Sequence, residues 1–337
     1  MKALVTGATG FLGGALAHRL HALGWNVTAQ GRDPSALKAL EAQGVRAVQV
    51  NLEDTQAIVN ACRGQEIVFH SGALANDWGR PEAFRNANVL GTQNVIRGCQ
   101  EQKVKRLVHV STPSIYFRFA PRLNVKETDP LPPPVTEYAR TKRLAEDEVD
   151  KAFAMGLPTV IIRPRAIFGP GDRIILPRLI NRLERGILRV IGDGQNLADM
   201  SYIENVVDAL LLCAEAPAHA LGKKYNITNG EPIRLWKMIE KLCQRLDLKY
   251  PTQRVPYPLV DKIAGAMEFV ARLLPNQLEP PLTRYSVAMI SLTTTLDISA
   301  ARRDLGYAPR VSNEEGFERF VEWWKSKSDW QSDLQQK

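Results

Sequence analysis

An α/β fold with a doubly wound parallel sheet is predicted for this chain by three features of its sequence. Short apolar runs alternate with helical patterns through the N-terminal half, which is typical of βαβ units. These runs are rich in Val and Ile and do not alternate with polar residues, as in strands that are buried on both faces of a sheet. A glycine cluster, TGATGFLGG at residues 6–14, directly follows the first run and opens a helical pattern.

The elements of the N-terminal half can be placed in order along the chain. Strands are expected at residues 2–7, 26–31, 45–50, 66–72, 106–111 and 158–164. Helices are expected at residues 10–24, 33–44, 55–64 and 85–102 and around Tyr138. Because strands alternate with helices throughout, the connections predict parallel rather than antiparallel pairing.

The pattern changes after Pro164, where a Gly/Pro-rich loop at residues 167–176 is followed by a basic helix near 175–186. A later helix and strand within residues 201–228 predict a return to the main sheet. We therefore expect a large domain and a smaller C-terminal α/β domain, since single cores stop growing near about 250–300 residues. The larger domain would take residues 1–170 and about 200–228, and the smaller one residues 171–199 and 229–337.

Composition excludes several classes of protein. The 337 residues carry a formal net charge of +8, but no block of five Lys or Arg occurs, so nucleic acid is not an expected partner. The four cysteines form no C-x-x-C pair, and we interpret them as reduced core residues of a cytoplasmic protein. The N-terminus runs directly into a strand, without the pattern of a secretory signal. No uncharged apolar run reaches about 18 residues, so no transmembrane helix is expected.

The glycine cluster predicts a phosphate-binding loop. Gly7, Gly10 and Gly13 form G-x-x-G-x-x-G rather than the common G-x-G-x-x-G. Glycines permit the tight turn and let the backbone approach a pyrophosphate, while the helix N-terminus supplies N–H groups and the positive end of a dipole. The sequence therefore predicts a Rossmann-type domain that binds a dinucleotide.

The residues that end the second strand bear on the choice of dinucleotide. An acidic residue there would bind the 2′-hydroxyl of NAD, whereas an arginine accommodates the 2′-phosphate of NADP. The chain has Arg32 at this point, and the nearby Asp33 precedes Pro34 in the pattern of a helix N-cap. We therefore predict NADP, with NAD as the alternative; an exposed loop arginine without a ligand is the simpler interpretation of Arg32.

Tyr138 and Lys142 are four residues apart at the start of an expected helix, directly after a run of prolines. Residues with this spacing lie on one face of a helix. A lysine cation close to a phenol favours the phenolate and lowers the tyrosine pKa, so the pair suits proton exchange with a substrate. A solvated helix face is the alternative for this pair taken alone.

Several motifs in order make the chain resemble the extended short-chain dehydrogenase/reductase family, also called the NAD-dependent epimerase/dehydratase family. The resemblance covers nearly the whole chain. The motifs are TGATGFLG, FHSGA, NVLGT at residues 88–92, VHVSTPSIY, YARTK, RPRAIFGPGD, DMSYIENVVDA and ARRDLGYAP. The segments HSGALANDWG and RPRAIFGPGD are similar to the branch of 3β-hydroxysteroid dehydrogenases and 2-alkyl-3-oxoalkanoate reductases.

The resemblance implies roles for individual residues. Tyr138 would be the general acid/base, Lys142 would contact the nicotinamide ribose, and Thr112 would bond the substrate oxygen, with Ser111 and Ser114 as competing hydroxyls. Asn88 would organise the site or serve only as a buried helix cap. The residues implied to line the cofactor are Gly7, Thr9, Gly10, Phe11, Leu12, Gly13, Arg32, Asn51, Leu52, Ser71, Gly72, Ala73, Tyr138, Lys142, Pro164 and Ile167.

Two kinds of enzyme share these motifs. A reductase would interconvert a ketone and a secondary alcohol, whereas a nucleotide-sugar epimerase or dehydratase would retain its NAD. Arg32 favours the reductase, as does the absence of an acidic pair after Thr112, where Pro113 and Ser114 follow. A non-enzymatic relative would have lost Tyr138, which this chain retains.

Two stripes of side chains bear on the substrate. One helical face of residues 259–274 would carry Val260, Ile263, Met267, Val270 and Leu274. This apolar face suits a steroid-like or long-chain substrate, although core packing is the alternative.

A basic stripe would carry Arg178, Arg182, Arg185 and Arg189. It could receive an anionic substrate or an acidic membrane surface, or it could be plain solvated surface, and Gly186 would remove Arg189 if it ends the helix. A homodimer is expected.

Overall fold

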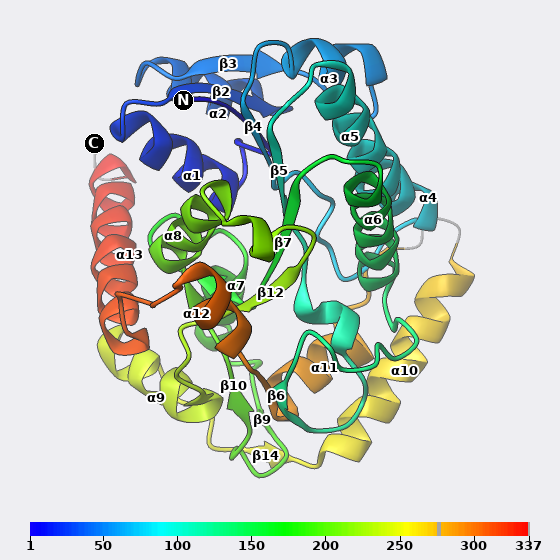
Figure 1. The fold of residues 1–337 in the computed structure, drawn as a ribbon. Coiled ribbons are helices and arrows are strands. Elements are labelled where there is room, and N and C mark those ends of the chain that lie inside the picture. The colour runs from blue at the N-terminus through cyan, green and yellow to red at the C-terminus, as the bar shows by residue number, and fades with distance from the viewer. Residues whose placement is uncertain (275–277, 336–337) are drawn as a thin grey trace.

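The main feature of the chain is a seven-stranded sheet, seen in a computed structural model that describes residues 1–274 and 278–335 (Figure 1). The strand order is β12-β7-β5-β4-β1-β2-β3, and every neighbouring pair is parallel. The strands are β1 (Lys2–Thr6), β2 (Asn26–Gly31), β3 (Arg46–Gln49), β4 (Ile67–His70), β5 (Arg106–Val110), β7 (Thr159–Pro164) and β12 (Lys224–Ile227). The predicted α/β class with a doubly wound parallel sheet is confirmed.

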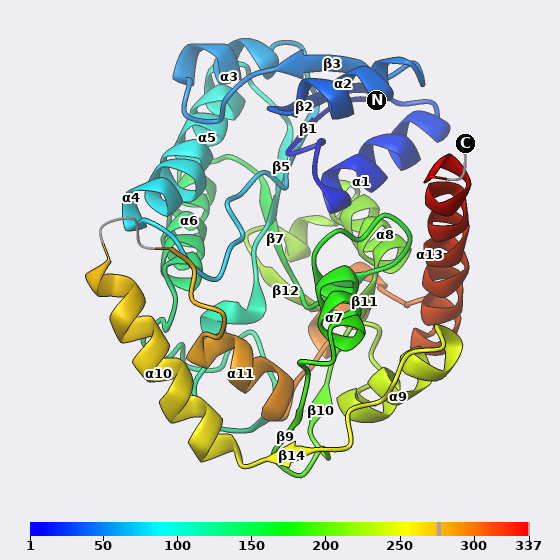
Figure 2. The same cartoon turned by 180° about the vertical axis from the view of Figure 1, so that it is seen from behind.

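Helices cover both faces of this sheet, as Figures 1 and 2 show. The helices of one face are α1 (Phe11–Ala22), α2 (Pro34–Glu41), α7 (Ile175–Glu184) and α8 (Ile203–Ala214). Those of the other face are α3 (Thr55–Ala61), α5 (Gly91–Glu101) and α6 (Glu137–Ala154). Successive residues of one strand enter different cores: Ala3 and Val5 pack on the first face and Leu4 on the second. The strands lack polar alternation because both of their faces are buried.

A smaller part of the molecule is built around a four-stranded sheet of order β13-β10-β15-β6. Its strands are β6 (Arg122–Val125), β10 (Leu197–Ala198), β13 (Ile233–Arg234) and β15 (Thr294–Leu296). Its helices are α9 (Leu235–Arg245), α10 (Tyr257–Leu273), α11 (Arg284–Ser291), α12 (Ser299–Leu305) and α13 (Asn313–Gln335). The sequence did not predict β6, which brings a segment of the first 170 residues into this sheet.

Short elements complete the chain. They are α4 (Pro81–Phe84), η1 (Arg85–Leu90), η2 (Pro113–Tyr116), η3 (Ala218–Ala220), β8 (Ile167–Phe168), β9 (Val190–Ile191), β11 (Ser201–Tyr202) and β14 (Arg254–Val255). Pairs β11–β8 and β14–β9 form two small ladders. The return of α8 and β12 to the main sheet places β12 beside β7; how the chain divides into functional domains stays a prediction.

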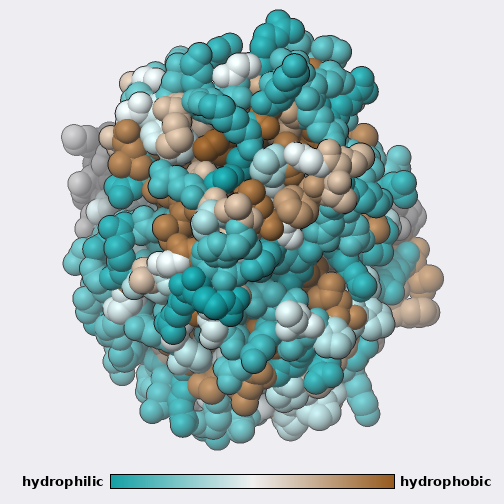
Figure 3. Space-filling model, in the orientation of Figure 1, coloured by the Kyte–Doolittle hydropathy of each residue, from teal (hydrophilic) through white to brown (hydrophobic). Residues whose placement is uncertain are grey.

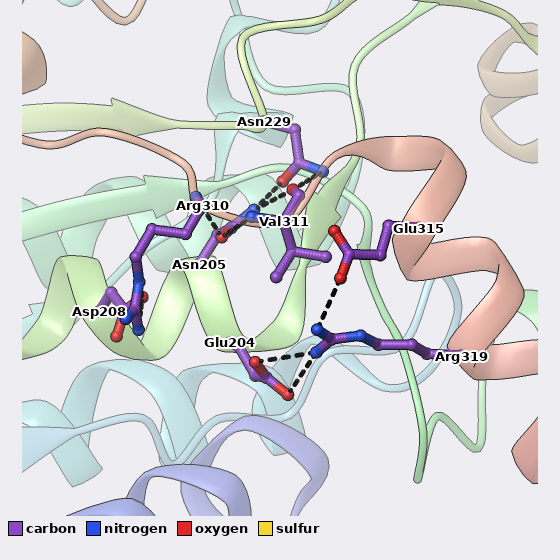
Figure 4. Close-up of polar contacts among 8 residues, drawn as sticks. All are labelled: Glu204, Asn205, Asp208, Asn229, Arg310, Val311, Glu315 and Arg319. Atoms are coloured by element: carbon purple, nitrogen blue, oxygen red, sulfur yellow. Dashed lines mark hydrogen bonds and ion pairs between the residues drawn. The ribbon is translucent and has the colours of Figure 1, made fainter.

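Asn205 of α8 fixes the segment that leads into α13 (Figure 4). Its side-chain oxygen accepts from the amides of Arg310, at 2.9 Å, and Val311, at 3.1 Å. Its amide nitrogen donates to the carbonyl of Val311 and to the side chain of Asn229. Two surface ion pairs lie beside these hydrogen bonds: Arg310 pairs with Asp208, and Arg319 pairs with Glu204. The DMSYIENVVDA motif thus holds the C-terminal segment against α8.

The four cysteines, Cys62, Cys99, Cys213 and Cys243, are buried in the core and are not disulfide-bonded. Within the described residues, no helix combines the length and apolar character that crossing a bilayer requires.

Candidate active site

Helix α6 presents Tyr138 and Lys142 because its start is defined by its sequence. Pro130 and Pro132–Pro134 cannot extend a helix backwards, and the Thr136 side chain then caps the first turn by accepting from the amide of Ala139 at 3.1 Å. The helix begins at Glu137, so Tyr138 and Lys142 share one face.

Lys142 is almost completely buried, with 2% of its surface exposed. Its amine donates to the carbonyl of Val110 at 2.8 Å and lies 3.1 Å from Nε2 of His109. Burial lowers the pKa of Lys142 to about 8, while Glu146 opposes the shift. Burial also holds the pKa of His109 well below its usual value, so the imidazole is neutral and can accept from the ammonium.

Tyr138 does not behave as the sequence predicted. Burial raises the pKa of Tyr138 to about 12, against a hydrogen bond from the side chain of Thr112 that lowers it. The expected lowering by Lys142 is wrong, because the lysine amine is engaged with His109 and Val110 rather than with the phenol. Tyr138 is therefore a protonated phenol at neutral pH, which suits it to donate a proton.

A chain of hydroxyl groups extends from Tyr138. Thr112 Oγ1 donates to Ser114 Oγ at 3.0 Å, and Ser114 Oγ lies 2.9 Å from the hydroxyl of Tyr285 on α11. Of the two competing serines, Ser114 is part of this row of hydrogen-bonded hydroxyl groups. Ser111 Oγ is buried without a hydrogen bond to any described residue. Sequence analysis missed Tyr285, which lies 171 residues from Ser114 and carries no local motif.

The glycine loop is packed against the next layer of backbone. Gly7 has φ +68°, and a Cβ there would lie 2.6 Å from Cα of Gly72. A Cβ on Gly13 would lie 2.3 Å from the carbonyl oxygen of Gly7. Helix α1 begins after Gly10, which gives no side-chain cap, so its first N–H groups are available to a phosphate. The loop thus combines close backbone packing with an uncapped helix start, and the binding of a pyrophosphate there stays a prediction.

Comparison with known proteins adds an independent observation. Residues 3–228 match the model of the NAD dependent epimerase/dehydratase family. The chain belongs to this family. A 2-alkyl-3-oxoalkanoate reductase of Stenotrophomonas maltophilia (strain K279a) is 38% identical over 325 residues, which cover 95% of this chain and 98% of the relative.

Other family members widen the range of chemistry. A 3beta-hydroxysteroid-dehydrogenase/decarboxylase, isoform 1, of Arabidopsis thaliana is 36% identical over 299 residues, covering 85% of this chain and 68% of that protein. A solved structure, MoeE5 in complex with UDP-glucose and NAD, superposes with a TM-score of 0.77 at 26% identity and covers 97% of this chain and 99% of its own. The resemblance to the branch of reductases and hydroxysteroid dehydrogenases is thereby confirmed.

The remaining residues predicted to bind the family's cofactor lie at one edge of the sheet. Carboxyl ends of parallel strands meet there, in the place where such sheets bind ligands. Arg32 follows β2, Asn51 and Leu52 follow β3, Ser71, Gly72 and Ala73 follow β4, Pro164 ends β7, and Ile167 begins β8. Thr9, Phe11 and Leu12 belong to the loop and the start of α1. Their contacts with a cofactor stay a prediction.

At the ribose end of the family's cofactor site, Asp33 has another role. Its carboxylate caps α2 by accepting from the amides of Ser35, at 2.9 Å, and Ala36, at 3.2 Å. The predicted N-cap is confirmed, and it leaves Arg32 as an exposed cation beside the end of β2.

Asn88 connects the loop after β4 to α6. Its side chain bonds the backbone amide and carbonyl of Leu74, and it also donates to Thr141 Oγ1.

A cavity of about 660 Å³ lies beside Tyr285 and the start of α6. Its wall combines aromatic and apolar residues with charged ones. The lining residues are Asp77, Trp78, Gly79, Pro81, Phe84, Phe119, Pro134, Val135, Thr136, Glu137, Arg140, Glu268, Arg272, Thr283, Arg284 and Tyr285. A second hollow between α9 and α13 lies apart from this chemistry.

The residues of the predicted apolar stripe on α10 differ in burial. Val260 is buried, but Ile263, Val270 and Leu274 are exposed, and Glu268 and Arg272 face the cavity instead. These exposed side chains neither pack in the core nor line the cavity, and contact of the stripe with a substrate stays a prediction. Small residues, Ala264 and Ala271, form the buried side and let α10 pack closely on its neighbours. Brown atoms at the right-hand edge of Figure 3 mark the exposed apolar residues near the end of α10.

The basic stripe has fewer arginines than the four that the sequence predicted. Helix α7 ends at Glu184, and Gly186 adopts φ +62°. Arg189 therefore leaves the stripe and bonds the carbonyl of Gly186 at 2.7 Å. Burial raises the pKa of Asp77, and the positive charges of Arg178 and Arg182 oppose this shift. Both arginines are thus already balanced in part by an acid of the cavity wall.

Proposed function

We propose that the chain is an NADP(H)-dependent reductase that converts a hydrophobic 3-oxo acid into the 3-hydroxy acid. As a member of its family, it is an oxidoreductase that interconverts a ketone and a secondary alcohol of a hydrophobic substrate with a nicotinamide cofactor. The observation that carries the proposal is the hydroxyl chain of Tyr138, Thr112 and Ser114 beside a cavity with aromatic walls. The 3-oxo acid follows from the relative named 2-alkyl-3-oxoalkanoate reductase.

The side chains have separate roles in this reaction. Tyr138 hydrogen-bonds the ketone oxygen and donates its proton to it as negative charge develops there, and Thr112 would donate to the same oxygen once its hydroxyl proton turns away from Ser114. The buried ammonium of Lys142 bonds His109 and the carbonyl of Val110 and would bind the nicotinamide ribose with its third N–H, while the phenolate of Tyr138 takes a proton back from solvent. A bound dihydronicotinamide would supply the hydride to the ketone carbon. The aromatic wall of the cavity excludes water and holds the alkyl part of the substrate.

A panel of ketones tests the proposal directly. The purified chain is incubated with NADPH and, separately, 2-alkyl-3-oxo acids, 3-ketosteroids, aromatic ketones and UDP-glucose. We expect the highest kcat/KM for a long-chain 3-oxo acid. Turnover of the nucleotide sugar alone, with cofactor retained through purification, would instead favour an epimerase. Cytoplasmic location and a homodimer are part of the proposal, and light scattering tests the dimer.

Arg32 is expected to select NADP. Loss of a charge-assisted contact with the 2′-phosphate costs about 1.5–3 kcal/mol, so Arg32→Ala should weaken NADPH binding by about 10- to 150-fold. Binding of NADH should change little, because it lacks this phosphate. Fluorescence titration of both cofactors measures the difference. Equal losses for NADH and NADPH would contradict the assignment, and Arg46→Ala on the neighbouring strand serves as a control for a general loss of positive charge.

The pH dependence of reduction should follow Lys142. Its pKa of about 8 lies far below that of an ordinary lysine, because burial disfavours the cation. The cation is present below pH 8 and is lost above it, whereas Tyr138, with a pKa of about 12, keeps its proton through this range. We expect kcat/KM for ketone reduction to fall as the pH rises through about 8. A profile that stays level to pH 10 would show that the lysine charge is not required.

A further inference from the structure

Arg165 is a buried arginine whose backbone is fixed but whose Nε has no hydrogen-bond partner among the described residues. It follows β7, and its amide donates to Ile227 while its carbonyl accepts from Ser201 Oγ at 2.6 Å. Only 6% of its surface is exposed. Its Nε is buried without a hydrogen bond, and it forms no ion pair with any residue of the described ranges 1–274 and 278–335.

Arg163, two residues earlier and on β7 itself, gives the contrast. It is equally buried, but its guanidinium forms a two-pronged ion pair with Glu146 and bonds the hydroxyl of Tyr116. A buried charge without such partners costs several kcal/mol of folding free energy. The fold satisfies Arg163 of β7 completely and leaves Nε of Arg165, just after the strand, without a hydrogen bond to any described residue, which is the arrangement expected of a group kept for a ligand.

The acid that interacts with Arg165 does not satisfy it. Asp199 and the phenol of Tyr285 both interact electrostatically with the guanidinium. The Asp199 carboxylate, however, accepts from the amide of Leu296 at 2.6 Å, and its separation from Arg165 exceeds the 4.0 Å of an ion pair. Asp199 therefore moderates the charge of Arg165 without occupying its hydrogen-bonding positions.

Tyr285 connects this cation with the reacting group. Its hydroxyl lies 2.9 Å from Ser114 Oγ, which bonds Thr112, the partner of Tyr138. In a 3-oxo acid only one carbon separates the ketone from the carboxylate. A cation that binds this carboxylate must therefore lie next to the hydroxyl groups that bind the ketone oxygen. Tyr285 interacts electrostatically with Arg165 and bonds Ser114, so the same phenol contacts the hydroxyl chain and is influenced by the cation.

We propose that the guanidinium of Arg165 binds the carboxylate of the substrate and selects 3-oxo acids over neutral ketones. This inference rests on the proposed function. A guanidinium binds a carboxylate through two parallel N–H donors, and the interaction is strong in a site from which water is excluded. Arg178 and Arg182 are weaker candidates, because α7 carries them nearer the surface and Asp77 already interacts with both.

The test compares a 2-alkyl-3-oxo acid with its methyl ester, using NADPH and the variants Arg165→Met and Arg165→Lys. Arg165→Met should raise KM for the acid by about 10- to 100-fold and change KM for the ester by less than about twofold. Arg165→Lys keeps the charge but not the planar pair of donors, so its effect on the acid should be intermediate. Arg185→Met is the matched control, since Arg185 is exposed at the end of α7.

Thermal unfolding separates a binding role from a structural one. Replacing an unpaired buried charge by an apolar side chain removes a desolvation cost, so Arg165→Met should be at least as stable as the unaltered chain. A clear loss of stability in that variant, with equal effects on acid and ester, would overturn the inference. Should Arg165→Met fail to fold, an equal response of acid and ester in Arg165→Lys would overturn it as well.

Activity of the unaltered chain on the acid and on the ester separates failure of the proposed function from failure of the proposed carboxylate site. If this chain reduces neither acid nor ester, the proposed function fails. If it reduces both and Arg165→Met loses both alike, the proposed function stands and the carboxylate site does not. Calorimetric titration with the 3-hydroxy acid product and NADP gives a readout without turnover. We expect binding of this acid to weaken in Arg165→Met and to be unchanged in Arg185→Met.

Discussion

Tyr138→Phe is expected to lower kcat for ketone reduction by about 10²- to 10⁴-fold, the usual contribution of a positioned general acid. The change removes one hydroxyl from a partly buried ring and leaves its packing in place. Because the pKa of Tyr138 is raised to about 12, the phenol is the protonated donor at neutral pH. Its loss leaves the ketone oxygen without a proton source. Steady-state kinetics and NADPH titration of the same preparation measure kcat and cofactor binding.

Two companion variants sharpen this prediction. Tyr257→Phe removes a hydroxyl at the start of α10 and should leave kcat within about twofold, as expected for a surface change. Tyr285→Phe removes the end of the hydroxyl chain and should cost less than Tyr138→Phe, because Thr112 remains bonded to Tyr138. Turnover by Tyr138→Phe at the rate of the unaltered chain would disprove the assignment of the proton donor.

Arg163→Met should destabilise the fold by about 3–5 kcal/mol, the cost of leaving one partner of a buried ion pair without compensation. Glu146 and Arg163 are 2% and 1% exposed, and two hydrogen bonds join them, one of 2.8 Å from Nε. The guanidinium also stacks on Tyr116, with Cζ 4.9 Å from the ring centroid. The variant removes both hydrogen bonds to Glu146 and both contacts with Tyr116, whose hydroxyl also accepts from the guanidinium. Urea denaturation monitored by circular dichroism gives the free energy of unfolding.

A second variant tests the physical reason for this loss. The double variant Arg163→Met with Glu146→Leu buries no charge and should be more stable than Arg163→Met alone. Arg97→Met is the control at an exposed pair with Glu101, where a loss of only about 0–1 kcal/mol is expected. A destabilisation by Arg163→Met no larger than that of Arg97→Met would show that the buried pair contributes little.

Local patterns predicted those parts of the molecule that local geometry determines. The glycine loop, the start of α6 and the N-cap at Asp33 all depend on residues within a few positions of one another. The parallel sheet followed from apolar runs separated by helices. The pKa of Tyr138 could not be predicted, because His109, on another element, holds the amine that the spacing assigned to the tyrosine.

Other features depend on partners distant in sequence. Tyr285 meets Ser114 only because α11 brings it to η2, the short segment after β5, and no periodicity indicates that contact. Arg163 and Arg165 are both arginines and are only two residues apart, so the sequence offers no sign that one is paired and the other is not. The stripe on α10 was correct as a helical pattern, but its orientation depends on which side α11 approaches.

The pairing of β6 with β15 has a consequence for synthesis of the chain. Asn124 bonds the Thr295 side chain across 171 residues, so β6 leaves the ribosome long before its partner strand exists. Domains fold as units, N-terminal parts first, as the chain emerges. The strands β1, β2, β4 and β5 can therefore assemble around the glycine loop early, while β6 stays an unpaired edge open to contact with other chains. A chain released before residue 294 would retain the loop yet lack β15, the strand that joins β6 to β10. Because an unpaired strand can pair with other chains, we expect such a truncated chain to aggregate.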